Sequence, residues 1–333
     1  MSGVALSASR AVSLASIQAP VRERLDRVHP ELHRIVVHGL PAIEAVSGHL
    51  LKRLGKMFRP TLSLLASDLD GKGDDRAITC AAAIELMHLA TLVHDDSVDH
   101  SVKRRGMPTV NALFSHEVSV IMGDFLYSRA LQAMVSLESL EIMRLLTEVS
   151  NELAVGEMRQ LGAIDKLSFD EAGYVALIRS KTGSLLRASC ETGTFFGAER
   201  FRAPMARYGE RLGLAFQIAD DLIDYVGDEA LAGKPTGADL KEHKVTLPLI
   251  AALPHMSAGA RKRVEALFAE PEPSDELVAE VVGIVGEAGG LEYARRRGAQ
   301  FADEAQEALA GLPDSPVRAA LADAIVYVMD RRT

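Results

Sequence analysis

Two short clusters of aspartates repeat in the sequence, and their spacing suggests chemistry. Each cluster has two adjacent aspartates and a third three residues later, and each follows a Leu-Ala pair at the same distance. Residues four apart share one face of a helix, so the first and last carboxylates of each cluster should converge. The clusters consist of Asp95, Asp96 and Asp99, and of Asp220, Asp221 and Asp224.

Carboxylates held this close repel one another unless water, protons or cations neutralise them. All the candidate ligands are hard oxygens without an accompanying Cys or His pair, a set that favours magnesium over zinc. Magnesium usually binds one or two carboxylates and completes its shell with water and substrate phosphate. One such cluster could be a solvated helix end, but two matching clusters predict a shared metal and diphosphate site across a cavity.

Basic residues near the clusters are candidates for binding the phosphates. Lys56 and Arg59 lie beside a turn at Gly55, and Arg104 and Arg105 follow the first cluster directly. A second anionic substrate would need a cationic site apart from the carboxylates. The other candidates are His88, Lys181 with Thr182, Lys234 and Lys244. Each alone is more often a surface charge or a satisfied core histidine, so their placement matters more than their type.

Helices should position all these residues. Apolar residues recur three and four apart through most of the chain, as in Leu62, Leu65, Ala66 and Leu69. No pair of alternating strands joined by a tight turn is evident, so the predicted fold class is all-α. Loops are expected at 70–75, 106–108, 227–237 and 270–274. We expect a flexible N-terminal extension over residues 1–20 and one helical domain over residues 21–333.

Composition limits the possible classes of protein. The 333 residues are 48% hydrophobic, which is enough for a sizeable core, and the formal charge of −9 argues against nucleic acid as a partner. Cys80 and Cys190 have no metal-type spacing, so buried free thiols are expected. No uninterrupted apolar stretch reaches about 18 residues. A cytoplasmic protein without stable membrane insertion is therefore expected.

In this order, the motifs resemble those of the trans-isoprenyl diphosphate synthases, also called polyprenyl synthetases. The resemblance covers roughly residues 50 to 250. It rests on Gly-Lys-x-x-Arg-Pro at 55–60, Glu-Leu-x-His at 85–88, the two aspartate clusters, Arg104-Arg105-Gly106, Gly123-Asp124, Lys181-Thr182, Phe216-Gln217 and the segment from Asp239 to Pro248. Met57, where the family commonly has Arg, and Ser115-His116, where a small Gly-containing turn is usual, depart from the pattern.

The resemblance implies a bundle of long helices around a central cavity, usually in a homodimer. It implies condensation of isopentenyl diphosphate with an allylic diphosphate (geranyl, farnesyl or geranylgeranyl), with about three Mg²⁺ ions per site. The implied ligands of magnesium on the allylic diphosphate are Asp95, Asp96, Asp99, Asp220 and, in the same cluster, Asp221 and Asp224, assisted by Arg104, Lys181, Lys234 and Lys244. Isopentenyl diphosphate would be held by Lys56, Arg59, His88 and Arg105. Thr182 and Gln217 would border the reacting carbons.

The apolar segment before Asp95 predicts the product length. Thr91 and Ala90 lie about 6 to 7.5 Å below Asp95 along a helix, where short-chain members of the family usually carry an aromatic stopper. Met87, about 12 Å down, is flexible and could yield to a longer chain. Leu131 and Met134 are candidates for a deeper floor. A long-chain product similar to quinone side chains is therefore expected.

Other classes remain open at this point. A farnesyl or geranylgeranyl diphosphate synthase would share all the motifs and differ only in its floor. A class I terpene cyclase shares the first cluster but needs no isopentenyl site. A non-catalytic subunit of a heteromeric synthase and a helical scaffold with solvated acids are further alternatives.

Overall fold

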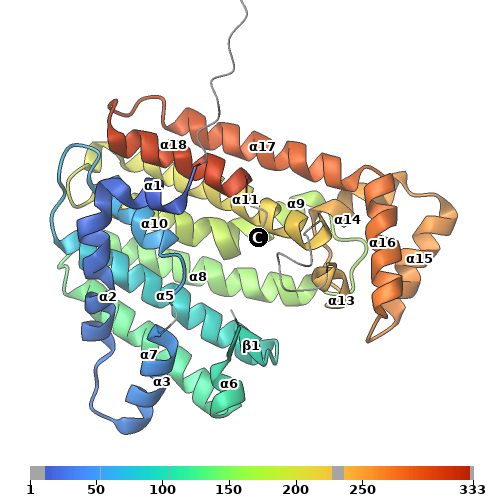
Figure 1. Ribbon diagram of the computed structural model, residues 1–333, viewed down its shortest axis with the longest axis horizontal. Helices are drawn as coiled ribbons and strands as arrows, with labels where there is room; N and C mark the ends of the chain where they lie inside the picture. The colour runs from blue at the N-terminus through green and yellow to red at the C-terminus, as the bar shows by residue number, and fades with distance from the viewer. Residues whose placement is uncertain (1–11, 53, 105, 227–235, 331–333) are drawn as a thin grey trace, which may run out of the picture.

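The chain folds into a bundle of helices, as the apolar periodicity predicts (Figure 1). The computed structural model describes residues 12–52, 54–104, 106–226 and 236–330. The only strands in these ranges are β1 (Lys103–Arg104) and β2 (Met107–Pro108), which pair antiparallel where a loop was expected. The described helices are α1 (Leu14–Gln18), η1 (Ala19–Val21), α2 (Arg22–Val36), α3 (Pro41–Leu51), α4 (Phe58–Ser67), α5 (Arg76–Val98), α6 (Val110–Leu113), α7 (His116–Val135), α8 (Leu140–Ala163), α9 (Glu171–Ile178), η2 (Arg179–Gly183), α10 (Ser184–Thr194), η3 (Glu199–Phe201), α11 (Arg202–Val226), α13 (Ala238–Lys241), α14 (Leu247–Ala252), η4 (Leu253–His255), α15 (Ala258–Ala269), α16 (Asp275–Glu287), α17 (Gly290–Ala308) and α18 (Pro316–Met329).

The core surrounds α5 and α10. Helix α5 packs against α2, α4, α7 and α10, and α10 also packs against α11. The run Ala81–Ala83 on α5 is fully buried, and such small side chains let neighbouring helices approach closely. At Gly193 of α10 a Cβ would lie 2.1 Å from the Ser63 carbonyl oxygen of α4, so only glycine fits at this crossing. Both aspartate clusters therefore lie on helices that the core holds firmly.

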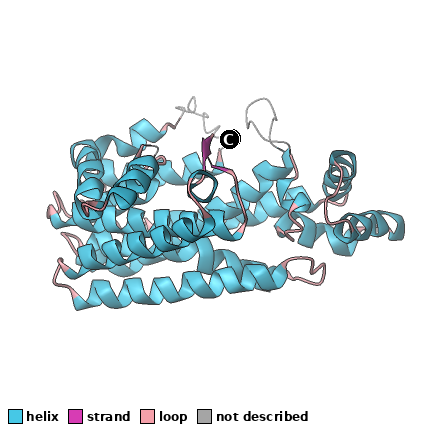
Figure 2. Cartoon of the chain, turned by 90° about the horizontal axis from the view of Figure 1, so that it is seen from below, coloured by secondary structure: helices cyan, strands magenta, loops and turns pink. Residues whose placement is uncertain are grey.

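The long helices run side by side through the body, with the short hairpin at its edge (Figure 2). Helices α15 and α16 pack on each other at one end, beyond α13 and α14 (Figure 1). From there, α17 returns along α11 and leads into α18. The C-terminal helices are thus joined to the helix that carries the second aspartate cluster.

Part of the expected N-terminal extension is folded. Residues 1–11 lie outside the described residues, but α1 and η1 together occupy residues 14–21. Ser13 caps α1 by accepting a hydrogen bond from the Ser16 backbone N–H, and Ile17 is fully buried. Helix α1 packs against α18 at the other end of the chain. The expected boundary at residue 20 therefore assigns Ile17, a core residue, to the N-terminal extension.

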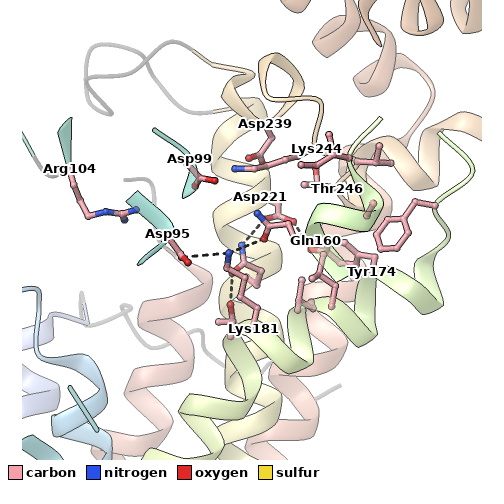
Figure 3. A pocket seen from close by; sticks show the side chains of 18 residues that line it. Asp95, Asp99, Arg104, Gln160, Tyr174, Lys181, Asp221, Asp239, Lys244 and Thr246 are labelled. Carbon is pink, nitrogen blue, oxygen red and sulfur yellow. Dashed lines mark hydrogen bonds and ion pairs between the residues drawn. The ribbon is translucent and has the colours of Figure 1, made fainter. Parts of the chain in front are cut away.

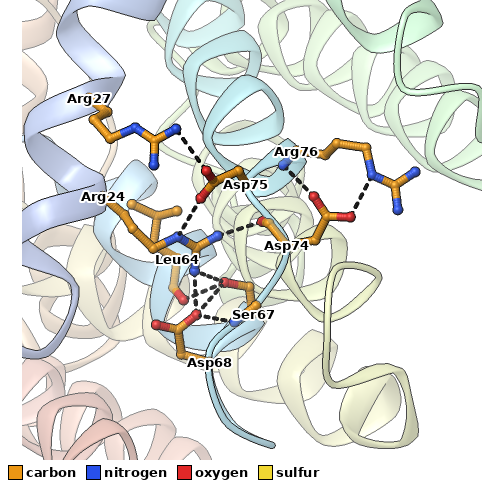
Figure 4. A network of polar contacts seen from close by, with 9 residues as sticks. Arg24, Arg27, Leu64, Ser67, Asp68, Asp74, Asp75 and Arg76 are labelled. Atoms are coloured by element: carbon orange, nitrogen blue, oxygen red, sulfur yellow. Dashed lines mark hydrogen bonds and ion pairs between the residues drawn. The ribbon is translucent and has the colours of Figure 1, made fainter.

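A buried arginine ties α2 to the turn between α4 and α5 (Figure 4). Arg24 is 3% exposed and forms an ion pair with Asp68. Its guanidinium also donates to Ser67 Oγ at 2.9 Å and to the Asp74 carbonyl oxygen at 2.6 Å. At the surface, Arg27 adds a 2.8 Å bond to Asp75. Because a buried charge is costly unless paired, this network fixes the start of α5.

Helix α5 alone among the described helices is long and apolar enough to cross a membrane by length and composition. Most of its apolar window, 67%, is buried inside the protein, and its last turn carries acidic residues, as expected for a core helix. Cys80 on this helix and Cys190 on α10 are buried free thiols, as predicted. Burial raises the pKa of the Cys80 thiol to about 12, so it stays protonated.

Candidate active site

A cavity of about 260 Å³ lies where the polar ends of several helices meet (Figure 3). Helix α5 contributes Asp95 and its C-terminal capping residue, Asp99. Helix α11 contributes Asp221. The two aspartate clusters thus face one cavity, as their repetition predicted. The other lining residues are Arg104, Gln160, Ala163, Ile164, Phe169, Tyr174, Leu177, Ile178, Lys181, Thr182, Gln217, Asp239, Lys244, Val245 and Thr246.

Asp95 is a mostly buried carboxylate that faces this cavity. Burial raises its pKa, the ammonium of Lys181 opposes that rise, and the nearby Asp99 carboxylate adds to it. Lys181 Nζ lies 3.6 Å from Asp95 Oδ2, too far for a strong hydrogen bond. Asp95 and Asp99 therefore present negative charge that a further cation would stabilise.

Asp96 points to the other side of α5. It accepts a 2.7 Å hydrogen bond from Arg104 Nε, and its side chain is 8% exposed. Burial raises the pKa of Asp96, and this bond counters the rise. Asp96 lines a separate small cavity with Arg104, next to the β1–β2 hairpin. The structure thus pairs Asp96 with Arg104 and leaves Asp95 and Asp99 facing the main cavity.

Lys181 is held by residues of α8 that the sequence analysis missed. Its Nζ donates to Glu157 Oε2 and to Gln160 Oε1, both at 2.9 Å. Burial raises the pKa of Glu157, and the charge of Asp95 adds to the rise while Lys181 opposes it. Lys181 and Thr182 lie in η2, a turn of π-helix, a distortion that is frequent at functional sites. Glu157 and Gln160 lie three residues apart, on one face of a helix, and this spacing could have indicated that they act together.

The second aspartate cluster has a buried hydrogen-bond chain behind it. The Tyr174 hydroxyl donates to Asp221 Oδ2 at 2.5 Å, and Gln217 Nε2 donates to Asp221 Oδ1 at 2.9 Å. Thr182 Oγ1 in turn donates to Gln217 Oε1 at 2.7 Å. Burial raises the pKa of Asp221 to about 6, although both donors stabilise its charged form. Asp221 thus orients Gln217 and Thr182, and the sequence analysis did not identify Tyr174.

Asp224 does not line the main cavity. Its two carboxylate oxygens accept hydrogen bonds from the backbone N–H groups of Ala238 and Asp239, at 3.1 and 3.0 Å, at the start of α13. Asp224 therefore fixes the segment that carries Asp239 and Lys244 into the cavity. Asp220 precedes Asp221 on α11 and is partly exposed.

Asp239 and Lys244 are neighbouring charges at the cavity wall. Burial raises the pKa of Asp239 well above its usual value, and the charges of Asp221 and Asp224 add to the rise. Burial alone would lower the pKa of Lys244, but its hydrogen bond to Glu242 raises the value overall. Lys244 thus stays charged and gives this acidic wall a cation. The sequence analysis used Asp239 only as part of a matching segment.

The carboxylates fit magnesium only if a ligand completes the shell. Among the described residues, no three Asp, Glu, His or Cys side chains converge closely enough to hold a metal alone. Asp95 and Asp99 offer hard oxygens on one wall of the cavity, which is the donor type that magnesium prefers. A site with few protein ligands suits a metal that keeps water and phosphate in its shell.

A second cavity, of about 530 Å³, brings together Lys56, Arg59 and His88, as the sequence predicted. Successive residues of α11 line the two cavities, because Phe216 borders this one and Gln217 the main one. The aromatic rings of Phe58 and Tyr327 complete the wall, and their ring centres lie 6.2 Å apart. Arg105 and Lys234, two further predicted cations, lie outside the described residues.

The predicted chain-length residues lie along α5 and α7. Met87 and Ala90 are buried, and the partly exposed Thr91 donates a hydrogen bond from its hydroxyl to the His88 carbonyl oxygen. On α7, Met134 is fully buried and Leu131 is partly buried. No aromatic residue occupies position 90 or 91, as the long-chain prediction requires.

Solved structures with the same arrangement define the class of this protein. A decaprenyl diphosphate synthase from Rhodobacter capsulatus is 35% identical, with a TM-score of 0.91, over 96% of this chain and 100% of that chain. A polyprenyl synthase from Caulobacter crescentus CB15, solved with calcium and isoprenyl diphosphate, is 31% identical, with a TM-score of 0.91, over 98% and 100% of the two chains. The fold is therefore that of the all-α isoprenoid synthases.

Sequence comparison identifies the family. The octaprenyl diphosphate synthase of Haemophilus influenzae is 34% identical over 96% of this chain and 98% of its own length. The model of the polyprenyl synthetase family matches residues 40–285. The chain belongs to the polyprenyl synthetase family and is a prenyltransferase enzyme that makes polyprenyl diphosphates.

Proposed function

We propose that this enzyme condenses isopentenyl diphosphate with an allylic diphosphate, head to tail, to build a long all-trans polyprenyl diphosphate. The observation that carries the proposal is that helices α5 and α11 each line both of two cavities that differ in charge. The main cavity combines carboxylates with Lys181 and Lys244, whereas the second has Lys56, Arg59 and His88. This arrangement suits two diphosphates, one bound through metal and one bound directly by cations.

The main cavity suits the allylic diphosphate. Asp95, Asp99 and Asp220 would hold Mg²⁺, about three ions with the substrate in place, and Lys181 and Lys244 would bind phosphate oxygens. Bound magnesium would stabilise negative charge on the departing diphosphate. To reach the phosphate, Lys181 Nζ would have to break at least one of its hydrogen bonds to Glu157 and Gln160. The paired Asp96 and Arg104 would hold the rim of this site in place.

The second cavity suits isopentenyl diphosphate, whose alkene attacks the allylic cation. Lys56, Arg59 and His88 would bind its phosphates, and the aromatic rings of Phe58 and Phe216 would pack against its carbon atoms. Thr182 and Gln217 line the main cavity, and Phe216, next to Gln217 on α11, lines the second, so the new bond would form beside these residues. Loss of a proton, to the departing diphosphate, restores an allylic product that can react again.

A long product is supported by the relatives and by helix α5. Relatives named octaprenyl and nonaprenyl diphosphate synthases align over most of this chain, and Ala90 and Thr91 leave no aromatic stopper one turn below Asp95. The test is to supply magnesium, labelled isopentenyl diphosphate and farnesyl diphosphate, and to size the dephosphorylated products by chromatography. A series that extends well beyond geranylgeranyl is expected. A series that ends at farnesyl or geranylgeranyl would contradict the long-chain assignment.

A homodimer in the cytoplasm is the proposed state. Several large apolar side chains on α7 and α8 are exposed, including Ile121 at 65% and Met158 at 69%. Large exposed apolar side chains often mark an interface between proteins, and a second copy of this chain fits because a surface can pair with itself. Sedimentation should give twice the mass of the chain. A monomer that incorporates no label would favour a subunit of a heteromeric synthase, since one relative is named component 2 of heptaprenyl diphosphate synthase.

A further inference from the structure

The loop that presents Lys56 to the second cavity has an unusual backbone. Met57, the residue before α4, has φ 53° and ψ 34°, in the left-handed region. That conformation is strained for an L-residue, and it persists only where surrounding contacts hold it. Lys56 and Phe58, on either side of Met57, both line the second cavity. The contacts that hold Met57 therefore also decide where Lys56 lies.

Gln18, at the end of α1, supplies part of those contacts, and the Thr61 backbone N–H adds a 3.0 Å bond to the Met57 carbonyl oxygen. Gln18 Nε2 donates to the Lys56 carbonyl oxygen at 3.0 Å and to Thr61 Oγ1 at 3.3 Å. Thr61 Oγ1 donates in turn to the Met57 carbonyl oxygen at 2.7 Å. Gln18 is 7% exposed, so its amide has little access to water. One amide group thus holds, directly or through Thr61, the two carbonyl groups that flank the φ angle of Met57.

Helix α1 is itself anchored beside the same cavity. Ile17, next to Gln18, is fully buried, and α1 packs against α18. Helix α18 carries Tyr327, whose ring centre lies 5.8 Å from Lys56 Nζ. The backbone of Lys56 is therefore held from α1 and its ammonium is placed over a ring of α18. Residues from opposite ends of the chain meet at one loop.

We infer that Gln18 is a positioning residue for the isopentenyl half of the reaction. It acts through the backbone of the Lys56 loop and does not touch the substrate. The inference rests on the proposed function, in which Lys56 binds isopentenyl diphosphate. Because the Gln18 side chain bonds to Lys56 and Thr61, beside the second cavity, its loss should weaken the binding of isopentenyl diphosphate and spare that of the allylic diphosphate. In the sequence alone, Gln18 falls within residues 1–20, where a flexible extension was expected, and it has no predicted role.

The test is Gln18→Met in the full chain, which keeps the side-chain length and removes both hydrogen bonds. The KM for isopentenyl diphosphate should rise about tenfold, whereas the KM for farnesyl diphosphate and kcat at saturation should change by less than about twofold. Calorimetric binding of isopentenyl diphosphate, which needs no turnover, should weaken by the same factor. Ser13→Ala removes the cap of the same helix away from the loop and should leave both KM values unchanged.

Lys56→Ala separates the two ways in which this experiment can fail. If Lys56→Ala raises the KM for isopentenyl diphosphate and Gln18→Met does not, the role of Gln18 is wrong and the proposed function stands. If neither variant raises it, the assignment of the second cavity to isopentenyl diphosphate is itself wrong. If Gln18→Met raises both KM values equally and lowers the urea midpoint, Gln18 only stabilises the fold, and the inference is overturned.

Discussion

The hydroxyl of Tyr174 and the carboxylate of Asp221 lie 2.5 Å apart in the buried wall behind the main cavity. The bond connects α9 to α11 and begins the chain of hydrogen bonds that continues through Gln217 to Thr182. A residue of the second aspartate cluster thus orients neighbouring side chains. Within this cluster, Asp221 orients neighbouring side chains, whereas Asp220 is a proposed magnesium ligand. Substitutions at single residues can test the two roles separately.

Tyr174→Phe should lower kcat about tenfold, because Asp221 loses a donor and Gln217 loses its fixed orientation. Steady-state kinetics with both substrates measures this effect. Tyr208→Phe is the matched control, since Tyr208 is also fully buried and donates at 2.8 Å to the Leu321 carbonyl oxygen, outside the main cavity. Both variants should lose similar stability. An equal loss of kcat in the two would argue against a specific role for Tyr174.

Asp95→Asn should reduce kcat on the order of a thousandfold, because a proposed magnesium ligand at the main cavity is lost. Calorimetry should also show that magnesium no longer strengthens the binding of a non-reactive farnesyl analogue. Asp124→Asn provides the comparison, since the side chain of Asp124 is 74% exposed and lines neither cavity. Retention of magnesium-dependent binding in Asp95→Asn would remove Asp95 from the proposed ligands.

Arg24→Met should lower the free energy of unfolding by about 3 kcal/mol, because Asp68 keeps a partly buried charge without its ion pair. Urea denaturation followed by circular dichroism gives the value. Arg22→Met should change it by less than about 0.5 kcal/mol, since the Arg22–Asp26 pair is about 60% exposed. A small effect at Arg24 would mean that water readily replaces its partners.

The pH dependence of stability should report the buried carboxylate of Asp221. Its pKa in the folded protein is about 6, above the ordinary value of 3.8, so between these values the folded state binds more protons than the unfolded state. Stability therefore falls as the pH rises through this window. The difference in free energy of unfolding between Asp221→Asn and the parent should shift in favour of the variant from pH 4 to pH 7. A difference that is constant with pH would contradict the raised pKa.

Thr91→Tyr should shorten the product, because it places an aromatic ring about 6 Å below Asp95. The length of the dephosphorylated products measures the effect, while the rate of the first condensation should be nearly unchanged. Thr91→Val keeps the volume and should leave the product length as in the parent. An unchanged product in Thr91→Tyr would place the growing chain along another face of α5.

The sequence predicted the elements and the general site because both depend on local patterns. Apolar residues three and four apart identify helices, and the repeated clusters indicate that Asp95 and Asp221 face one cavity. The different roles of the aspartates within each cluster could not be predicted from the sequence. Asp96 pairs with Arg104 on strand β1, and Asp224 accepts from the first backbone N–H groups of α13; both contacts depend on how the following segment folds back.

The supporting residues were also missed, for a related physical reason. Tyr174, Glu157 and Gln18 act through hydrogen bonds to partners 24 to 47 positions away in the chain. Nothing in the local sequence distinguishes a buried tyrosine or glutamine with such a partner from an ordinary one. Ile17, which lies within the expected N-terminal extension, is likewise buried only by virtue of its packing in the folded chain.

Helix α5 joins the core and the reacting end of the site in one rigid piece. Its acidic last turn is fixed by the packing of α4, α7 and α10 along the rest of its length. Substitutions at successive turns can therefore change how deep a product reaches while the distance from each turn to Asp95 stays constant. On the proposed assignment, product depth would be set at Met87, Ala90 and Thr91 and reactivity at Asp95, which are different points of the same helix.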